Sequence, residues 1–287
     1  MISLTQEEID KILSGKELKK ISSDLGYFSK PFRIYHANKE FVVKLYFPVR
    51  NYALVSSIIK NHNDYINELK FIGLRIPETT ILAKKAGNKH QLIIIQESFR
   101  DDELLRNCIK EASVSGLPDL CYLVFDDIIK FWKRKKTSLE IGFHPTLRNY
   151  SLHEGSLYFF DTFPPMLMNQ KKLNRLIIKM SPYGGWIKKL VPPWLMNKVT
   201  DEYYHLDKMF IGIVGSCCRL RPDDAGKILA FSIKYVKDTV LLSESEKTSI
   251  IKLLNKPPEL SKIWILIRKL SGNTGSPNIK SPGVPVF

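Results

Sequence analysis

The stretch GFHPTLRNYSLHEGSLYFFDTFPP, residues 142–165, gathers side chains suited to chemistry. Asn149 is followed by a hairpin pattern and, twelve residues on, by Asp161 at the end of an apolar strand. A hairpin between them can therefore bring both side chains close together at its open end. His144 precedes Asn149 by five residues, and a histidine side chain can accept a proton near neutral pH. The stretch predicts proton transfer beside two oxygen-bearing side chains.

The elements around this stretch change character once along the chain. Strand-like runs fill residues 20 to 98, apart from one helical pattern, NYALVSSIIKNHNDYINELKFI, and helical patterns dominate after about residue 100. We expect an α+β protein with a small antiparallel sheet lobe, including a short leading helix, over residues 1–98. A larger helical lobe that contains the hairpin is expected over residues 99–270. Residues 271–287, rich in Gly, Pro and Ser, are expected to form a flexible tail.

Composition narrows the class of protein. The longest apolar run, around MFIGIVGSCC, is about half of what a bilayer-spanning helix needs, and MISLTQEEIDKILSG lacks the pattern of a secretory signal. The four cysteines show no metal-ligand spacing, which predicts a reducing, cytoplasmic location. The 44 Lys and Arg against 29 Asp and Glu give a net charge of +15, which attracts nucleotides, nucleic acid or an anionic membrane without choosing among them.

Four sequence pieces follow one another in the order EFVVKLYF, ELKFIGLRIPETTIL, QLIIIQES and HPTLRNYSLHEGSLYFFDTF. In that order they resemble the third strand, the next helix end and strand, the strand leading to the hinge, and the catalytic loop of the protein-kinase-like superfamily. The resemblance is closest to its aminoglycoside and small-molecule phosphotransferase branch. It covers roughly residues 20–240 and implies a two-lobed kinase-like fold with ATP- and Mg²⁺-dependent transfer of phosphate to a hydroxyl of a small molecule.

The resemblance also implies which side chains bind the nucleotide. Lys44 would bind the phosphates of the nucleotide. The segment DLGYFSKPF stands where the family has a glycine-rich phosphate loop, and Gly26 is its one glycine. Glu97 and Ser98 stand where the hinge would contact the nucleotide.

The carboxylate that would pair with Lys44 from the following helix stays open between two candidates. Glu68 is the candidate by residue type. Asp64, one turn earlier, better fits the distance to the GLRIP turn.

The catalytic loop departs from the family pattern at one position. Asn149 and Asp161 match the two metal ligands, but the catalytic aspartate expected five residues before the asparagine is His144. The alternative register with Thr146 leaves only three residues and is rejected. A base at this position contributes about 10² to 10⁴ in rate, and a histidine supplies a proton acceptor without a fixed negative charge. A structural histidine in the loop is the alternative.

Three functions are therefore open. The first is a small-molecule phosphotransferase, the second a catalytically impaired pseudokinase that binds a nucleotide or a partner, and the third a basic adaptor for anionic membrane or nucleic acid. The segment TFPPM after Asp161 favours the small-molecule branch or a static binding protein, since its two prolines discourage a mobile activation segment. Trp186, Trp194, Tyr203 and Tyr204 are candidates for an acceptor pocket, although aromatic residues at such spacings more often belong to a core.

Overall fold

The computed structural model describes residues 7, 9–11, 19–20, 29–36, 39–180 and 193–255. Its amino-terminal part carries an antiparallel sheet with the strand order β1-β2-β3-β5-β4. The predicted small antiparallel sheet is thus confirmed, whereas most of the expected leading helix lies outside the described residues. The strands are β1 (Lys19–Lys20), β2 (Ser29–His36), β3 (Lys39–Tyr46), β4 (Thr79–Ala86) and β5 (Lys89–Glu97).

The two faces of this sheet bury different clusters, because successive side chains of a strand point to opposite faces. Ile93 and Ile95 of β5 belong to one apolar cluster, and Leu92 and Ile94 belong to another that packs against the helix α2. Lys44 of β3 lies directly opposite Ile94 in the register. Directly opposed residues share a face. Lys44 is therefore placed on the side of the sheet that α2 covers.

The helix α2 (Tyr52–Ile72) connects β3 to β4 and has a defined start and end. The Asn51 side chain accepts a hydrogen bond of 3.0 Å from the Leu54 N–H, which satisfies one free donor of the first turn. Gly73 ends the helix with φ of 100°, a left-handed conformation that glycine adopts at little cost. The fully buried positions recur every three or four residues and form one face: 55, 58, 62, 65, 66, 69 and 72.

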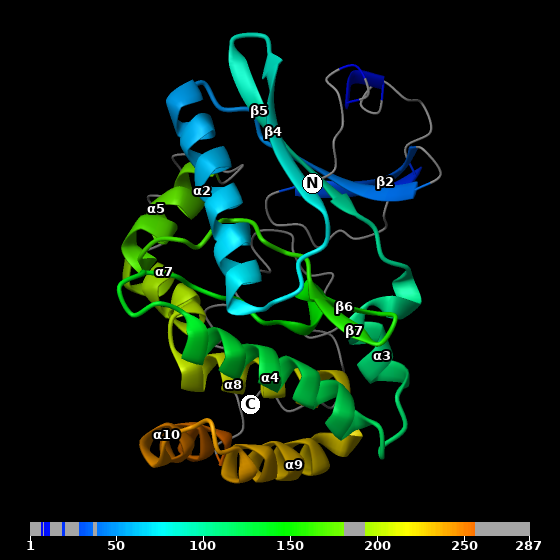
Figure 1. The fold of residues 1–287 in the computed structure, drawn as a ribbon, viewed down its shortest axis with the longest axis vertical. Coiled ribbons are helices and arrows are strands. Elements are labelled where there is room, and N and C mark those ends of the chain that lie inside the picture. Colours follow the sequence, from blue (N-terminus) through cyan, green and yellow to red (C-terminus); the bar gives the residue numbers. More distant parts are fainter. Residues whose placement is uncertain are drawn as a thin grey trace.

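The rest of the described chain is mainly helical, as predicted from its patterns. Figure 1 shows α4 and α8 side by side below the sheet, with α9 and α10 at the far end of the molecule. None of the described helices is long and apolar enough to cross a membrane. The elements are η1 (Asp101–Glu103), α3 (Leu105–Glu111), α4 (Leu117–Arg134), η2 (Leu147–Asn149), α5 (Gln170–Met180), α7 (Pro193–Thr200), η3 (Asp201–Tyr203), α8 (Leu206–Leu220), η4 (Pro222–Asp224), α9 (Ala225–Asp238) and α10 (Glu244–Leu254).

A two-stranded hairpin, β6 (Tyr150–His153) and β7 (Ser156–Phe159), lies between the sheet and the helices (Figure 1). The Phe159 N–H donates 2.9 Å to the Arg75 carbonyl, just after α2. A single β-bridge joins Ser151 to Leu104 of the segment that leaves the sheet. The hairpin is therefore tied to both lobes, and the residues at its two ends are held where the lobes meet.

Candidate functional site

Lys44 and Asp161 meet, although they are 117 positions apart in the sequence. The Lys44 Nζ atom lies 3.2 Å from Asp161 Oδ1, and the two side chains are 13% and 40% exposed. β3 supplies the lysine, and the residues that follow β7 supply the aspartate. The pair is therefore partly shielded from water while the carboxylate stays accessible to a ligand.

Asn149 is held next to the residue that precedes Asp161 by its backbone, and its side chain is fixed to the loop that carries His144. Its Nδ2 atom donates 2.9 Å to the His144 carbonyl, and its own carbonyl accepts 2.9 Å from the Phe160 N–H, next to Asp161. The side chain is buried. Because the amide nitrogen is used on a carbonyl, the Oδ1 atom is the one that Asn149 can offer to a cation.

His144 contacts a carboxylate and a ring from η3. Its Nε2 atom lies 3.4 Å from Glu202 Oε1, and its ring centroid is 4.2 Å from that of Tyr203 at 43°. A backbone hydrogen bond of 2.9 Å from Phe143 N–H to the Tyr203 carbonyl fixes the loop against η3. Sequence reasoning missed Glu202, because no motif links it to His144.

The four aromatic residues considered for an acceptor pocket have different positions. Tyr203 packs on His144, and Tyr204 donates 2.8 Å to the Met168 carbonyl. Trp194 is exposed, and Trp186 lies outside the described residues. Tyr203 and Tyr204 therefore both lie against residues 142–144.

The predicted partners of Lys44 on α2 both pair elsewhere, which corrects the prediction. Asp64 lies 2.6 Å from Lys60 on the outer surface of α2. Glu68 lies 3.9 Å from Lys136, just after α4. The prediction was made from residue type and distance along the helix, and it ignored which face of α2 is turned to the sheet.

His62 occupies the place next to Lys44 on the buried face of α2. It is fully buried, and its Nε2 atom shares a hydrogen bond of 2.9 Å with Thr162 Oγ1. Burial and then the charge of Lys44 lower the pKa of His62 to about 3, so its imidazole is neutral. At about 100° per residue, Asp64 points roughly 200° away from His62, which explains why it faces solvent.

The other predicted nucleotide contacts are only partly described. Gly26 lies outside the described residues. Glu97 ends β5, and its N–H donates 2.9 Å to the Glu78 carbonyl. The Ser98 N–H donates 3.1 Å to the Glu40 carbonyl, and the Ser98 hydroxyl donates 2.7 Å to the Glu40 carboxylate. These donors are used inside the protein, so a nucleotide base would have to bind through other groups of this segment.

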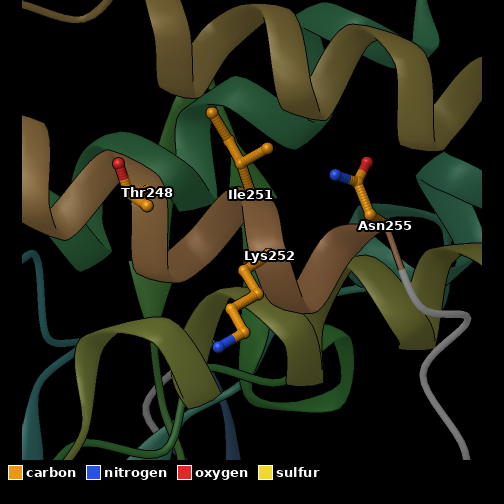
Figure 2. A pocket seen from close by; sticks show the side chains of 4 residues that line it. All are labelled: Thr248, Ile251, Lys252 and Asn255. Atoms are coloured by element: carbon orange, nitrogen blue, oxygen red, sulfur yellow. The ribbon is translucent and has the colours of Figure 1, made fainter.

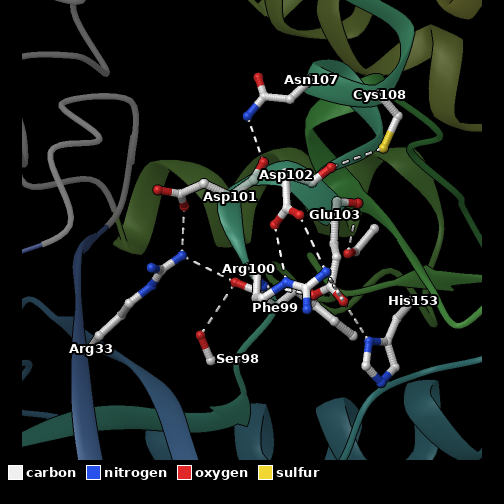
Figure 3. A network of polar contacts seen from close by, with 11 residues as sticks. Arg33, Ser98, Phe99, Arg100, Asp101, Asp102, Glu103, Asn107, Cys108 and His153 are labelled. Atoms are coloured by element: carbon white, nitrogen blue, oxygen red, sulfur yellow. Dashed lines mark hydrogen bonds and ion pairs between the residues drawn. The ribbon is translucent and has the colours of Figure 1, made fainter. Parts of the chain in front are cut away.

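A polar network fixes the segment between the lobes (Figure 3). Arg33 of β2 donates 3.0 Å to the Phe99 carbonyl and 2.6 Å to the Asp101 carboxylate. The His153 Nδ1 atom of the hairpin donates 2.8 Å to Glu103, and this hydrogen bond raises the pKa of His153. The sheet, the linking segment and the hairpin are thereby joined.

Three buried tyrosines lie within electrostatic range of Asp161. Burial raises the pKa values of Tyr46, Tyr65 and Tyr203, and the charge of Asp161 adds to each of these increases. The Tyr65 hydroxyl donates 3.0 Å to the Gly142 carbonyl, so α2 also contacts the start of the catalytic-loop segment. The carboxylate of Asp161 therefore contacts Lys44 and lies close enough to three neutral phenols to act on their pKa values.

The described residues contain no group of three or more His, Cys, Asp or Glu side chains that could hold a metal. Mg²⁺ does not require such a group, since it commonly binds one or two carboxylates together with water and substrate phosphates. A surface pocket on α10 is lined by Thr248, Ile251, Lys252 and Asn255 (Figure 2). It includes none of the predicted site residues.

Comparison with known families places the chain in one of them. A model of the DUF6206 family, described as a family of unknown function, matches residues 8–275, and the chain belongs to this family. No curated protein matches it.

Proposed function

We propose that this protein is an ATP- and Mg²⁺-dependent phosphotransferase that acts on a hydroxyl of a small molecule. The observation that carries the proposal is the contact between Lys44 and Asp161, with the Asn149 carbonyl hydrogen-bonded to the N–H of Phe160, the residue before Asp161. A lysine for phosphate and two oxygen ligands for a cation are the groups that phosphoryl transfer requires. The chain order of a central strand, a helix, and two further strands leading to the linking segment also agrees with the resemblance.

The residues present fit a magnesium nucleotide. Lys44 is a cation on a buried stem and would bind the phosphates, while Asp161 and the Oδ1 atom of Asn149 would hold Mg²⁺. When bound, the metal supplies charge neutralisation at the phosphate oxygens. The ion pair of Lys44 and Asp161 keeps both charges compensated before the nucleotide binds.

The path of the chain after Asp161 favours a small acceptor. Phe163 is buried and packs against Tyr46, with ring centroids 4.1 Å apart, and α5 begins at Gln170. The segment is therefore short and anchored in the cluster between the sheet and α5. It lacks the length and freedom with which a mobile segment would bind an extended protein substrate.

Thermal unfolding with Mg²⁺-ATP tests the proposal. A ligand at 100 times its dissociation constant adds about 2.7 kcal/mol to the free energy of unfolding, which is roughly 5–10 °C for a domain of this size. Asp161→Asn should lose this gain, because it removes the charged metal ligand while keeping the side-chain shape. Asp64→Asn is the matched control, since its carboxylate pairs with Lys60 at the surface, and it should keep the gain. An equal gain in Asp161→Asn and the wild type would refute the metal site.

A nucleotide-binding protein without transfer activity is the second candidate. The resemblance expects an aspartate where His144 stands, and the α2 residue that lies beside Lys44 is His62 and neither of the expected carboxylates. Neither of these two places in the site therefore carries a negative charge. Stabilisation by Mg²⁺-ATP without any formation of ADP would favour this candidate. Contact with anionic membrane or nucleic acid stays a prediction from the net charge.

A further inference from the structure

We propose that Glu202 is a positioning residue for His144. Its carboxylate holds the imidazole with the proton on Nε2 and leaves Nδ1 as the atom that takes the proton of the acceptor hydroxyl. This inference rests on the phosphotransferase function proposed above. It gives η3 a part in the chemistry of the site, although η3 carries no recognisable motif.

The geometry around the imidazole carries the inference. Glu202 Oε1 is 3.4 Å from Nε2, and an ionised carboxylate only accepts hydrogen bonds, so it favours the tautomer with the proton on Nε2. The carboxylate also lies against α8, since a Cβ atom on Gly212 would stand at a contact distance of 3.4 Å from Glu202 Oε2. Packing of the His144 ring on Tyr203 restricts its rotation.

The backbone keeps the same ring close to the proposed metal ligands. The His144 carbonyl accepts from the Asn149 side chain at 2.9 Å and from the Thr146 N–H at 3.0 Å. A shift of the histidine would therefore disturb Asn149 as well. The ring is 27% exposed, which leaves it accessible to an acceptor molecule.

The reaction step follows from this arrangement. The proton of the acceptor hydroxyl passes to Nδ1 of His144, and the acceptor oxygen forms a bond to the γ-phosphorus of ATP. The bond between that phosphorus and the β–γ bridging oxygen breaks, and ADP leaves with the electron pair. Glu202 stabilises the imidazolium that forms, which supplies the negative charge that the histidine itself lacks. The proton is then released to water.

The tautomer can be measured without knowing the acceptor. NMR of the full chain labelled with ¹⁵N at the histidine rings, with the His144 signals identified by their loss in His144→Gln, shows which nitrogen carries the proton. We expect protonated Nε2 and unprotonated Nδ1 in the wild type. Glu202→Leu should shift the population towards the other tautomer. Glu140→Leu, which removes an exposed carboxylate that pairs with Asn169, should leave the signals unchanged.

ADP formation from Mg²⁺-ATP, with water as the acceptor, gives the second readout. We expect a loss of about 10-fold in kcat for Glu202→Leu and about 10² to 10⁴ for His144→Ala. The double variant should be no slower than His144→Ala, because Glu202 acts through the ring. Nucleotide stabilisation in thermal unfolding should persist in all three.

Two results would overturn the role of Glu202. One is a wild-type His144 ring protonated on Nδ1, or a tautomer that Glu202→Leu leaves unchanged. The other is a double variant whose loss of kcat equals the product of the losses in the two single variants. Absence of both nucleotide stabilisation and ADP formation in the wild type would instead refute the proposed phosphotransfer, and the tautomer measurement would still decide whether Glu202 positions the ring.

Discussion

The buried imidazole of His62 makes the stability of the fold depend on pH in a way that can be calculated. Its pKa falls from an ordinary 6.5 to about 3 in the folded protein, because burial and then Lys44 disfavour the charged form. Between these two pKa values, His62 is therefore protonated in the unfolded chain and neutral in the folded protein. This stability is complete above pH ~6.5 and is lost as the pH falls towards ~3. At 1.36 kcal/mol per pKa unit the loss is about 2 kcal/mol by pH 5 and about 3 kcal/mol by pH 4.

The substitution His62→Gln isolates this contribution. A glutamine does not titrate and can still hydrogen-bond the Thr162 hydroxyl, so the other groups titrate alike in both proteins. Urea unfolding at pH 7 and pH 5 should show that the wild type loses about 2 kcal/mol more than the variant on acidification. Thr162→Val, which removes the hydroxyl and keeps the histidine, should retain the wild-type loss. The same loss in His62→Gln as in the wild type would show that the imidazole is not held neutral by its surroundings.

Two sites of substitution test packing in the helical lobe, one at Gly142 against Tyr204 and one at Arg221 against the end of α3. Gly142→Ala should destabilise the fold by about 1–3 kcal/mol, since a Cβ would come within 2.9 Å of the Tyr204 ring. Gly226→Ala is the control and should be neutral or stabilising, because a Cβ there would meet no atom within 4 Å. Urea unfolding compares the two variants, and equal changes in their free energy of unfolding would contradict the contact with Tyr204. Arg221→Ala should cost about 2–4 kcal/mol, because its guanidinium donates to three carbonyls at the end of α3. Arg221→Lys should not restore the loss, since a lysine lacks the planar fork, and full recovery of the unfolding midpoint would refute this account.

The coarse fold could be predicted from the sequence because each strand carries a local pattern. Period-two alternation marks β2 to β5, and the GLRIP turn after α2 marks the point where the helix must end. The hairpin of β6 and β7 was found from the short apolar runs on either side of Glu154 and Gly155. These signals are local, so they need no knowledge of which segments meet in space.

The partners within the site depend on contacts between segments and were not all found. The α2 residue nearest Lys44 was sought among carboxylates, although the apolar spacing of α2 already places His62 on its buried face. The spacing of the apolar residues could therefore have identified His62, but the prediction relied on residue type instead. No comparable signal existed for Glu202, because its approach to His144 depends on how η3 and α8 pack against the loop.

His144 stands where the resemblance expects an aspartate, and His62 lies beside Lys44 where Asp64 or Glu68 was expected. The two histidines have opposite surroundings. His62 is fully buried beside a lysine and is held neutral. His144 is partly exposed, and its Nε2 atom lies 3.4 Å from the carboxylate of Glu202. Under the proposed function, His62 therefore leaves Asp161 as the counter-charge of Lys44, and His144 gains from Glu202 the charge that an aspartate would carry itself. Under this proposal the negative charge is supplied by η3 and not by residues 142–149, and η3 carries no part of the family motif.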